Sequence, residues 1–272
     1  MNRKFTSLSY IYIIWTLMFI VFPLALVIFY AFTTGDIGEY KSLDFSFEYI
    51  SKFFKSKYFF VLLNSIKQAF ICTIISLLIG YPTAFFLYKM DKKKAKILML
   101  LIILPMWMNF LVRTYAWVNL LSRNGIINNF LSLFGIDAIK MLYTRGSILL
   151  GMVYNFLPFM IIPIYNIMEK IDKSYIEAAK DLGANDYNTF KNVIFPMSVP
   201  GIITGVTMVF IPAISTFEIS ALLGGNKYNL IGNVVEHQFK IAGNWHYGSA
   251  ISVVLLIIIL FAMFVTDKES EQ

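Results

Sequence analysis

Six long apolar runs alternate with shorter polar segments along the chain. The runs cover residues 10–32, 60–88, 97–121, 147–168, 200–223 and 247–266. Because a helix needs roughly 20 apolar residues to cross a bilayer, each run is long enough for one membrane span. The pattern therefore predicts an all-α integral membrane protein with about six transmembrane helices. We expect residues 1–272 to form a single transmembrane domain.

The basic residues between the runs predict which side of the membrane each polar segment faces. Residues 89–96 contain five lysines against the single acid Asp91, and Arg3 and Lys4 precede the first run. Because Lys and Arg concentrate in cytoplasmic loops, both segments are predicted to be cytoplasmic. Six spans then place the C-terminus on the same side, together with residues 169–199. The first run is longer than a signal-peptide core, so we interpret it as a retained span.

The amino-acid composition agrees with an integral membrane protein and excludes several kinds of functional site. Hydrophobic residues make up 58% of the chain and charged residues 14%, where soluble domains average about 25% charged. The net charge of +7 is explained by cytoplasmic anchoring of the spans rather than by nucleic acid. The single Cys72 and the distant His237 and His246 predict neither a disulfide framework nor a metal site. Without a catalytic constellation or a phosphate-binding loop, we expect no enzyme and no cofactor held by this chain.

The polar segment between the fourth and fifth runs is the most distinctive stretch. Ser174 and Glu177 have the spacing of a capping box at the start of a helix. Gly183 stands where a helix ends in the left-handed conformation, and Asp186 is predicted to cap a second helix that Pro196 ends. Two short helices at an angle, outside the membrane, indicate a docking element. Tyr175, Ala178, Ala179 and Leu182 recur at helical spacing and would form its contact face.

Three loops are predicted on the outer side, and the apolar patch in the second, residues 126–134, is too short for a span. Residues 33–57 are rich in aromatic side chains and are expected to form an amphipathic helix on the membrane surface. Residues 126–134 are expected to pack on the outer mouth, and residues 224–245 to form a re-entrant or surface segment.

Glu218 is an ionisable residue within the fifth run. Such a group costs roughly 2.5–3.5 kcal/mol at mid-membrane, so it normally faces a cavity or a partner. At ~1.5 Å per residue Glu218 lies ~27 Å from the inner end of the run, and Arg113 lies at a similar depth. Two interpretations stay open. Arg113 and Glu218 form an ion pair or reach outer water independently, or Glu218 is a carboxylate for a cationic substrate.

Aromatic and polar residues near prolines are further candidates for contact with a transported molecule. Pro105 is expected to bend the third run and is followed by Trp107 and Asn109. Trp107 lies near mid-span, where it either packs or offers an aromatic face to an ammonium group. Tyr154 stands in a similar proline-bent stretch of the fourth run.

The polar segment resembles the signature loop of the permease subunits of ABC importers. That signature is Glu-Ala-Ala, a Gly four residues later and a hydrophobic-Pro step about a dozen residues further on. Here it reads Glu177-Ala178-Ala179, Gly183 and Ile194-Phe195-Pro196. The stretches LPMWMNFLVRTYAW and LLGGNKYNLIGNVVEHQF are similar to those of permeases for the polyamines spermidine and putrescine.

The resemblance implies a type I ABC importer permease fold, MetI-like, in the cytoplasmic membrane. It further implies a second permease subunit, a cytoplasmic ATPase dimer that binds ATP and magnesium, and an extracellular polyamine-binding protein. Residues 169–199 would be the coupling loop. Its expected ATPase contacts are Glu177, Ala178, Ala179, Asp181, Gly183 and Pro196. The expected substrate-path residues are Trp107, Tyr49, Glu218, Asn109 and Tyr154.

Two alternatives remain at this point. The first alternative to a polyamine permease is a permease of the same family for another substrate, because a separate binding protein delivers the substrate. An ion-coupled carrier working alone would need buried acids in mid-span, and Glu218, near the outer end, does not supply them.

Overall fold

The computed structural model describes residue 10, residues 12–35 and residues 43–270, and most of these are helical. The helical elements include two π-helical turns, η1 and η4, and one 3-10 turn, η3. In chain order they are η1 (Leu17–Val21), α2 (Phe22–Ala31), α3 (Glu48–Lys55), α4 (Lys57–Lys89), α5 (Lys92–Ile103), η3 (Leu104–Trp107), α6 (Phe110–Leu121), α7 (Ile126–Ser132), α8 (Arg145–Glu169), α9 (Lys173–Asp181), α10 (Asp186–Thr189), η4 (Phe190–Ile194), α11 (Phe195–Ser215), α12 (Glu218–Gly224), α13 (Ile231–Lys240) and α14 (Trp245–Ser270).

Five helices within the described residues are long and apolar enough to cross a membrane. They are Tyr12–Ala31, Lys57–Lys89, Arg145–Glu169, Asp186–Ser215 and Trp245–Thr266. A bent pair, Lys92–Trp107 with Phe110–Ser132, adds a sixth if it is one broken span. The prediction of an all-α membrane protein with about six spans is confirmed.

The third apolar run is broken rather than gently bent. After Pro105 the 3-10 turn ends, Met108 is extended, and the two helices meet at 95°. The side chain of Asn109 then starts α6 by accepting the backbone N–H of Leu111 at 2.9 Å. A proline followed by an N-cap residue both stops one helix and begins another, so the bend is larger than a proline alone produces.

The chain divides into two compact units, which are described separately. The first comprises Met1–Val61 and Val234–Ile258, and the second comprises Leu62–Asn233 and Ile259–Gln272. In the first, β1 (Thr33–Thr34) pairs antiparallel with β2 (Asp44–Phe45), a hairpin that the sequence pattern did not predict. Ala31, Ala250 and Val253 form a small core there, with Tyr49 of α3 packed against it.

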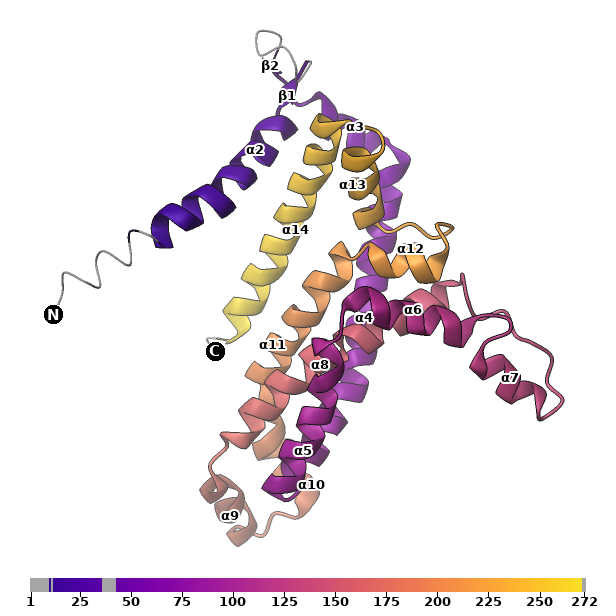
Figure 1. Cartoon of the computed structure of the whole chain (residues 1–272). Helices are drawn as coiled ribbons and strands as arrows, with labels where there is room; N and C mark the ends of the chain where they lie inside the picture. The colour runs from indigo at the N-terminus through magenta and orange to yellow at the C-terminus, as the bar shows by residue number, and fades with distance from the viewer. Residues whose placement is uncertain (1–9, 11, 36–42, 271–272) are drawn as a thin grey trace. The chain divides into compact units, whose positions relative to one another are not determined.

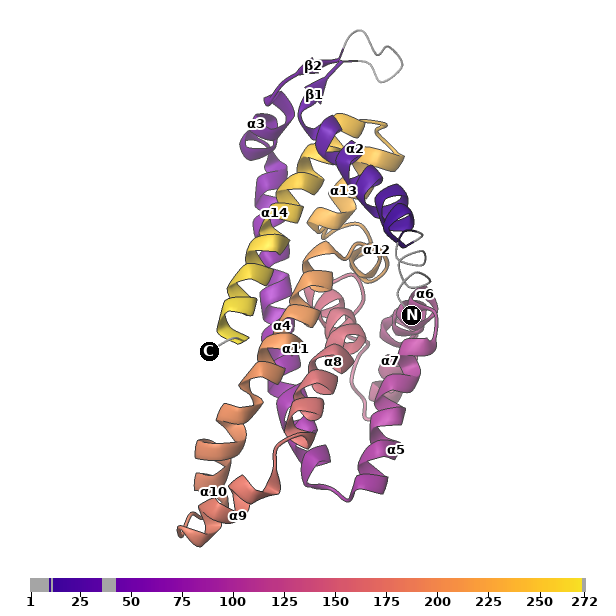
Figure 2. The same cartoon turned by 90° about the vertical axis from the view of Figure 1, so that its left-hand side faces the viewer.

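The second unit is built around α8, which packs along α11 and contacts α12. Glycines allow the close approach of these helices. A Cβ on Gly205 of α11 would lie 2.8 Å from Met160 Sδ, and one on Gly80 of α4 would lie 2.8 Å from Met160 Cγ. Figures 1 and 2 show α8 and α11 side by side, with α9 and α10 beyond their ends. The polar segment is therefore held at one end of a tightly packed bundle.

The three outer loops contain short helices, and their expected places at the membrane surface and outer mouth stay predictions. The expected amphipathic helix in residues 33–57 is α3, residues 126–134 contain the short α7, and residues 224–245 contain α13.

Candidate functional site

The first helix of the polar segment, α9, begins earlier than the sequence pattern predicted. The Asp172 carboxylate accepts the backbone N–H of Ser174 at 3.0 Å and is the N-cap. The capping box predicted for Ser174 and Glu177 is therefore wrong, because Ser174 already lies in the first turn. The contact with Ser174 lowers the pKa of the Asp172 carboxyl below its ordinary value.

The end of α9 is as predicted. Gly183 has φ +84°, the left-handed conformation that favours glycine. The Ala184 N–H donates to the Ala179 carbonyl at 3.0 Å, and the Gly183 N–H donates to the Lys180 carbonyl at 2.8 Å. These two hydrogen bonds form a Schellman motif and turn the chain sharply. No atom lies within 4 Å of where a Cβ on Gly183 would stand, so the glycine is needed for backbone conformation and not for space.

The second helix differs from the prediction at both ends. Asn185, and not Asp186, is its N-cap, since the Asn185 side chain accepts the N–H of Asn188 at 2.8 Å. Asp186 lies in the first turn and pairs with Lys180 at 3.3 Å on the exposed surface.

Pro196 does not end the second helix. Residues Asp186–Ser215 form one continuous helix through the π-helical turn η4, and Pro196 lies in the first turn of α11. The wider π-helical turn η4 places Pro196 in the first turn of α11. There the missing backbone N–H of proline costs the least stability. As a result, α10, η4 and α11 form one continuous helix from the polar elbow into the bundle.

One face of the elbow is apolar and uncovered within the described chain. Leu182 is 89% exposed, and Tyr175 and Tyr187 are exposed as well. Ala178 and Asp181 are exposed beside them, and Ala179 is half-buried. Large apolar side chains gathered on a protruding element indicate a surface for a protein partner. The predicted contact face is thus present, and it points away from the described chain.

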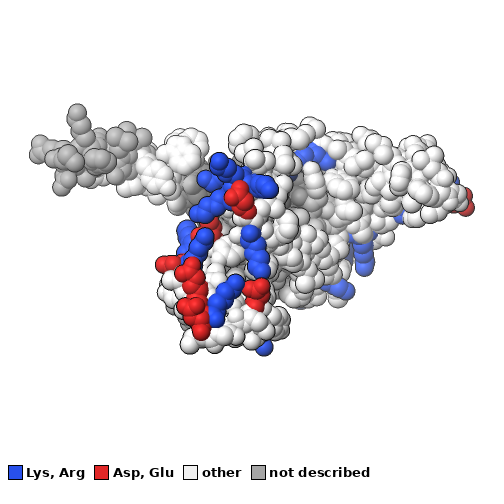
Figure 3. Space-filling model, turned by 90° about the horizontal axis from the view of Figure 1, so that it is seen from below, with Lys and Arg blue, Asp and Glu red and all other residues white. Residues whose placement is uncertain are grey.

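The opposite face of α9 borders a pocket of about 600 Å³. Lys173, Ile176, Glu177 and Lys180 line it from α9, together with residues at the adjoining ends of α4, α5 and α8. Glu177 therefore lies on the pocket side and not among the exposed apolar residues. Figure 3 looks onto this end and shows basic and acidic side chains gathered around a hollow.

The predicted substrate-path residues of the second unit lie on two helices, α8 and α12, and at the break before α6. Trp107 is 81% exposed at the break, next to the cap residue Asn109. The Tyr154 ring meets the Trp117 ring edge to face, with centroids 5.3 Å apart. The helices α8 and α12, which carry Tyr154 and Glu218, pack on each other and on α6.

The Arg113–Glu218 ion pair is not formed. The ion pairs of the described residues are Lys180–Asp186 and Lys240–Glu236. The fifth span ends at Ser215, so Glu218 lies beyond it, in the first turn of α12, where the helix dipole favours a carboxylate. Arg113 instead lies with its Cζ 5.8 Å from the centre of the Phe110 ring, and its Nε is buried without a hydrogen-bond partner in the described chain.

Tyr49 lies in the first unit, and its ring is occupied by neighbours from its own chain. It stacks on His246 with centroids 5.6 Å apart, and Lys52 Nζ lies 5.9 Å from its centre. His246 is buried, and its Nδ1 and Nε2 lie 3.0 Å and 3.2 Å from the carbonyl oxygens of Tyr30 and Gly35. Sequence reasoning missed this histidine, because nothing in its local pattern indicates contacts more than 200 residues away.

Comparison with known proteins agrees with this geometry. Residues 76–267 match the family described as "Binding-protein-dependent transport system inner membrane component". The spermidine/putrescine transport system permease protein PotB of Haemophilus influenzae is 39% identical over 97% of this chain and 93% of its own length. PotB of Escherichia coli K12 is 38% identical over 94% of each chain.

Solved structures show the same fold at low sequence identity. A bacterial ABC transporter for the import of the acidic polysaccharide alginate superposes with a TM-score of 0.77 at 21% identity, covering 97% of this chain and 95% of its own. The MetNI methionine ABC transporter superposes with a TM-score of 0.57 at 16% identity, covering 77% and 93%. The chain therefore belongs to the binding-protein-dependent transport system inner membrane components, the non-catalytic permease subunits of ABC transporters.

Proposed function

We propose that this chain is the permease subunit of an ATP-driven polyamine importer and forms half of its translocation path. The proposal is supported by relatives named for spermidine and putrescine transport, which align over 94–97% of the chain. Residues 1–272 act as a single transmembrane domain beside a second permease, and residues 169–199 are its coupling loop.

The observation that carries the coupling role is the exposed apolar elbow at the end of a continuous helix. Leu182 and Tyr187 are exposed at its tip, and α10 continues without interruption into α11. An ATPase subunit seated on this surface moves the elbow when it binds ATP and magnesium. Because α11 packs along α8, the movement reaches the bundle. The partner ATPase binds the ATP and the magnesium, and this chain transmits the movement to the bundle.

The proposed orientation places the elbow and both termini in the cytoplasm. Its support is that the basic loop of residues 89–96 and the segment that resembles a coupling loop meet in space. Lys89 and Lys92 of the basic loop and Lys173 and Lys180 of α9 line one pocket, so both segments lie at the same end of the second unit. A multi-pass protein of the inner membrane with this end inward satisfies the positive-inside rule.

An extracellular binding protein delivers the polyamine to the other end of the path. Trp107 supports an aromatic contact to an ammonium group there, because its ring is exposed at a break in the helix. Asn109, Tyr154, Glu218 and Tyr49 are the remaining proposed path residues.

Uptake by a reconstituted complex tests the proposal. The chain, its second permease, the ATPase and the binding protein are placed in vesicles and supplied with labelled spermidine. We expect uptake that requires ATP and the binding protein. Uptake of another substrate alone would show that the importer is specific for that substrate and not for polyamines. Uptake driven by an ion gradient without ATP would refute the proposed coupling to an ATPase.

A further inference from the structure

The pocket beside α9 lies where membrane-spanning helices end. It is lined by the last residues of α4, the first residue of α5 and the last residue of α8, together with one face of α9. Its lining residues are Leu87, Tyr88, Lys89, Met90, Lys92, Tyr165, Glu169, Ile171, Lys173, Ile176, Glu177 and Lys180. In the proposed orientation, this is the level of the phospholipid headgroups of the inner leaflet.

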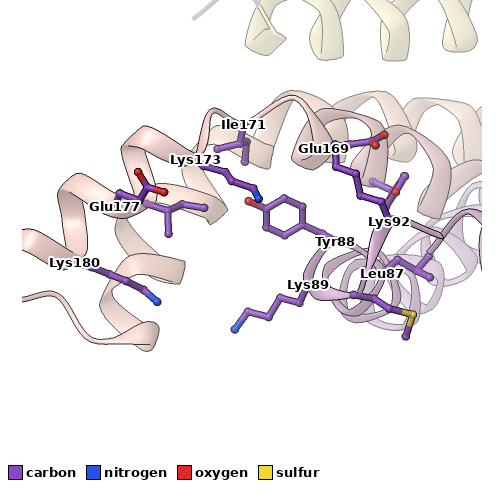
Figure 4. A pocket seen from close by; sticks show the side chains of 12 residues that line it. Leu87, Tyr88, Lys89, Lys92, Glu169, Ile171, Lys173, Glu177 and Lys180 are labelled. Atoms are coloured by element: carbon purple, nitrogen blue, oxygen red, sulfur yellow. The ribbon is translucent and has the colours of Figure 1, made fainter. Parts of the chain in front are cut away.

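The pocket carries an excess of positive charge. Four lysines face two glutamates in the lining, and Lys180 is already paired with Asp186. Lys89 Nζ lies 4.9 Å over the Phe85 ring, and Lys92 and Lys173 have no carboxylate partner among the described residues. Figure 4 shows Lys89, Lys173 and Lys180 reaching toward the open space beside Tyr88. Such an arrangement favours an anion with several acceptor oxygens.

Four aliphatic residues form an apolar part of the lining. Leu87 and Ile171 are buried in its wall, and Met90 and Ile176 complete it. A small inorganic anion gains nothing from such a wall, whereas the glycerol and first acyl carbons of a lipid do. Lysines beside an apolar wall at the end of spanning helices therefore match the two parts of a phospholipid.

The pocket lies opposite the exposed apolar face proposed for the ATPase, and of the expected ATPase contacts only Glu177 lines it. Lys173 and Ile176 on the pocket side precede Tyr175 and Ala178 on the exposed side by two residues each. Two residues correspond to about 200° around a helix, so the two faces are nearly opposite. An ATPase seated on Tyr175 and Leu182 would contact the face of α9 that does not line the pocket.

We propose that this pocket binds the phosphodiester headgroup of an anionic phospholipid and so joins the back of the coupling helix to the ends of α4, α5 and α8. The proposal goes beyond the transport function and uses only its orientation. Lys89, Lys92 and Lys173 contact the phosphate, and the apolar wall receives the glycerol end of the acyl chains.

Lipid binding to the full-length purified chain tests the proposal without any transport measurement. Native mass spectrometry counts bound phosphatidylglycerol and phosphatidylcholine when both are offered in a zwitterionic detergent. The test variant is K89Q/K92Q/K173Q. The matched control is K93Q/K94Q/K96Q, which removes the same charge from lysines of the same basic loop that do not line the pocket. Circular dichroism and size-exclusion chromatography check that both variants fold.

We expect the wild type to prefer phosphatidylglycerol and the test variant to lose at least tenfold in that affinity, since each lysine contributes about fivefold. The control variant is expected to lose less than threefold in affinity for phosphatidylglycerol. The variant K89R/K92R/K173R is expected to retain binding. If the triple variant does not fold, K173Q is tested alone, because Lys173 lies outside the spans. Its affinity for phosphatidylglycerol is expected to fall about fivefold.

Three results would overturn the proposal. Equal losses in the test and control variants would mean that only general surface charge attracts the lipid. Equal binding of the two phospholipids would remove the requirement for an anion. Displacement of the lipid by millimolar inorganic phosphate would assign the pocket to a free anion. None of these results depends on uptake, so failure of the transport proposal remains distinguishable.

Discussion

The Ala184 N–H donates to the Ala179 carbonyl at 3.0 Å and closes the end of α9 around Gly183. Ala179 is the second alanine of the Glu-Ala-Ala sequence, so the sequence signature and the turn are parts of one structure. The hydrogen bond requires Gly183 in the left-handed conformation and sets the angle between α9 and α10. The proposed docking surface therefore depends on this backbone turn.

Replacing Gly183 with valine is expected to abolish co-purification of the ATPase while the spans remain inserted. A β-branched residue pays at least about 1–2 kcal/mol at this φ, and the open space around the position rules out a clash as the cause. Pull-down of the ATPase and a topology reporter measure the two properties. Asparagine tolerates the conformation better, so G183N should retain part of the association.

The matched control is Gly135→Val. Gly135 also has positive φ, at +71°, and no atom lies within 4 Å of its added Cβ. The same strain is thus introduced away from the elbow. Loss of the ATPase in both variants would attribute the effect to general destabilisation.

The Asp172 cap makes the order of α9 dependent on pH. The pKa of this carboxyl is lowered in the folded chain, so its stabilisation is present at neutral pH and is lost as pH falls through the folded pKa. Hydrogen exchange at the amides of residues 174–176 should accelerate on acidification below about pH 4, beyond the intrinsic change. In D172A this additional pH dependence should disappear. If D172A and wild type exchange alike at neutral pH, the cap does not stabilise α9.

Replacing Trp107 with alanine is expected to weaken spermidine uptake without loss of assembly. A cation–π contact contributes about 0.5–2 kcal/mol, which corresponds to about a 2- to 30-fold rise in the spermidine concentration at half-maximal uptake. Leu104→Ala is the control, because Leu104 is exposed in the same 3-10 turn and has no aromatic face. Similar effects of the two substitutions would assign Trp107 to packing.

His246→Phe is expected to destabilise the first unit while keeping the ring stack on Tyr49. The substitution leaves the carbonyl oxygens of Tyr30 and Gly35 without their histidine partner. Loss of a partly buried hydrogen bond costs about 0.5–1.5 kcal/mol, so the Tm in detergent should fall by a few degrees. Tyr49→Phe, which keeps the stacked ring, is the control and should change the Tm little. An unchanged Tm in H246F would show that the two contacts contribute nothing.

The apolar runs and the glycine stop of α9 could be predicted because their signals are local. Twenty apolar residues suffice for a span, and Gly183 follows directly from the end of a helical pattern. The predicted positions of the two helix N-caps were wrong by one or two residues. Suitable side chains are present at Asp172, Ser174, Asn185 and Asp186, and packing decides among them.

The remaining differences arise from contacts that local pattern does not contain. Pro196 was expected to end a helix, but a π-helical turn absorbs it. Glu218 was placed in a span because the apolar pattern continues across the break after Ser215. The lysines of residues 89–96 were used for orientation alone, and only the fold reveals that Lys89 and Lys92 meet α9 across a pocket.

The most direct test of the central claim is ATP-driven spermidine uptake by a complex carrying Leu182→Asp. Leu182 is 89% exposed at the tip of the elbow, and Leu133, 79% exposed after α7, provides the control L133D. A carboxylate at a buried apolar interface costs several kcal/mol, so we predict at least a tenfold loss of uptake and of bound ATPase in L182D alone. Full uptake by L182D, or equal losses in L182D and L133D, would contradict the account.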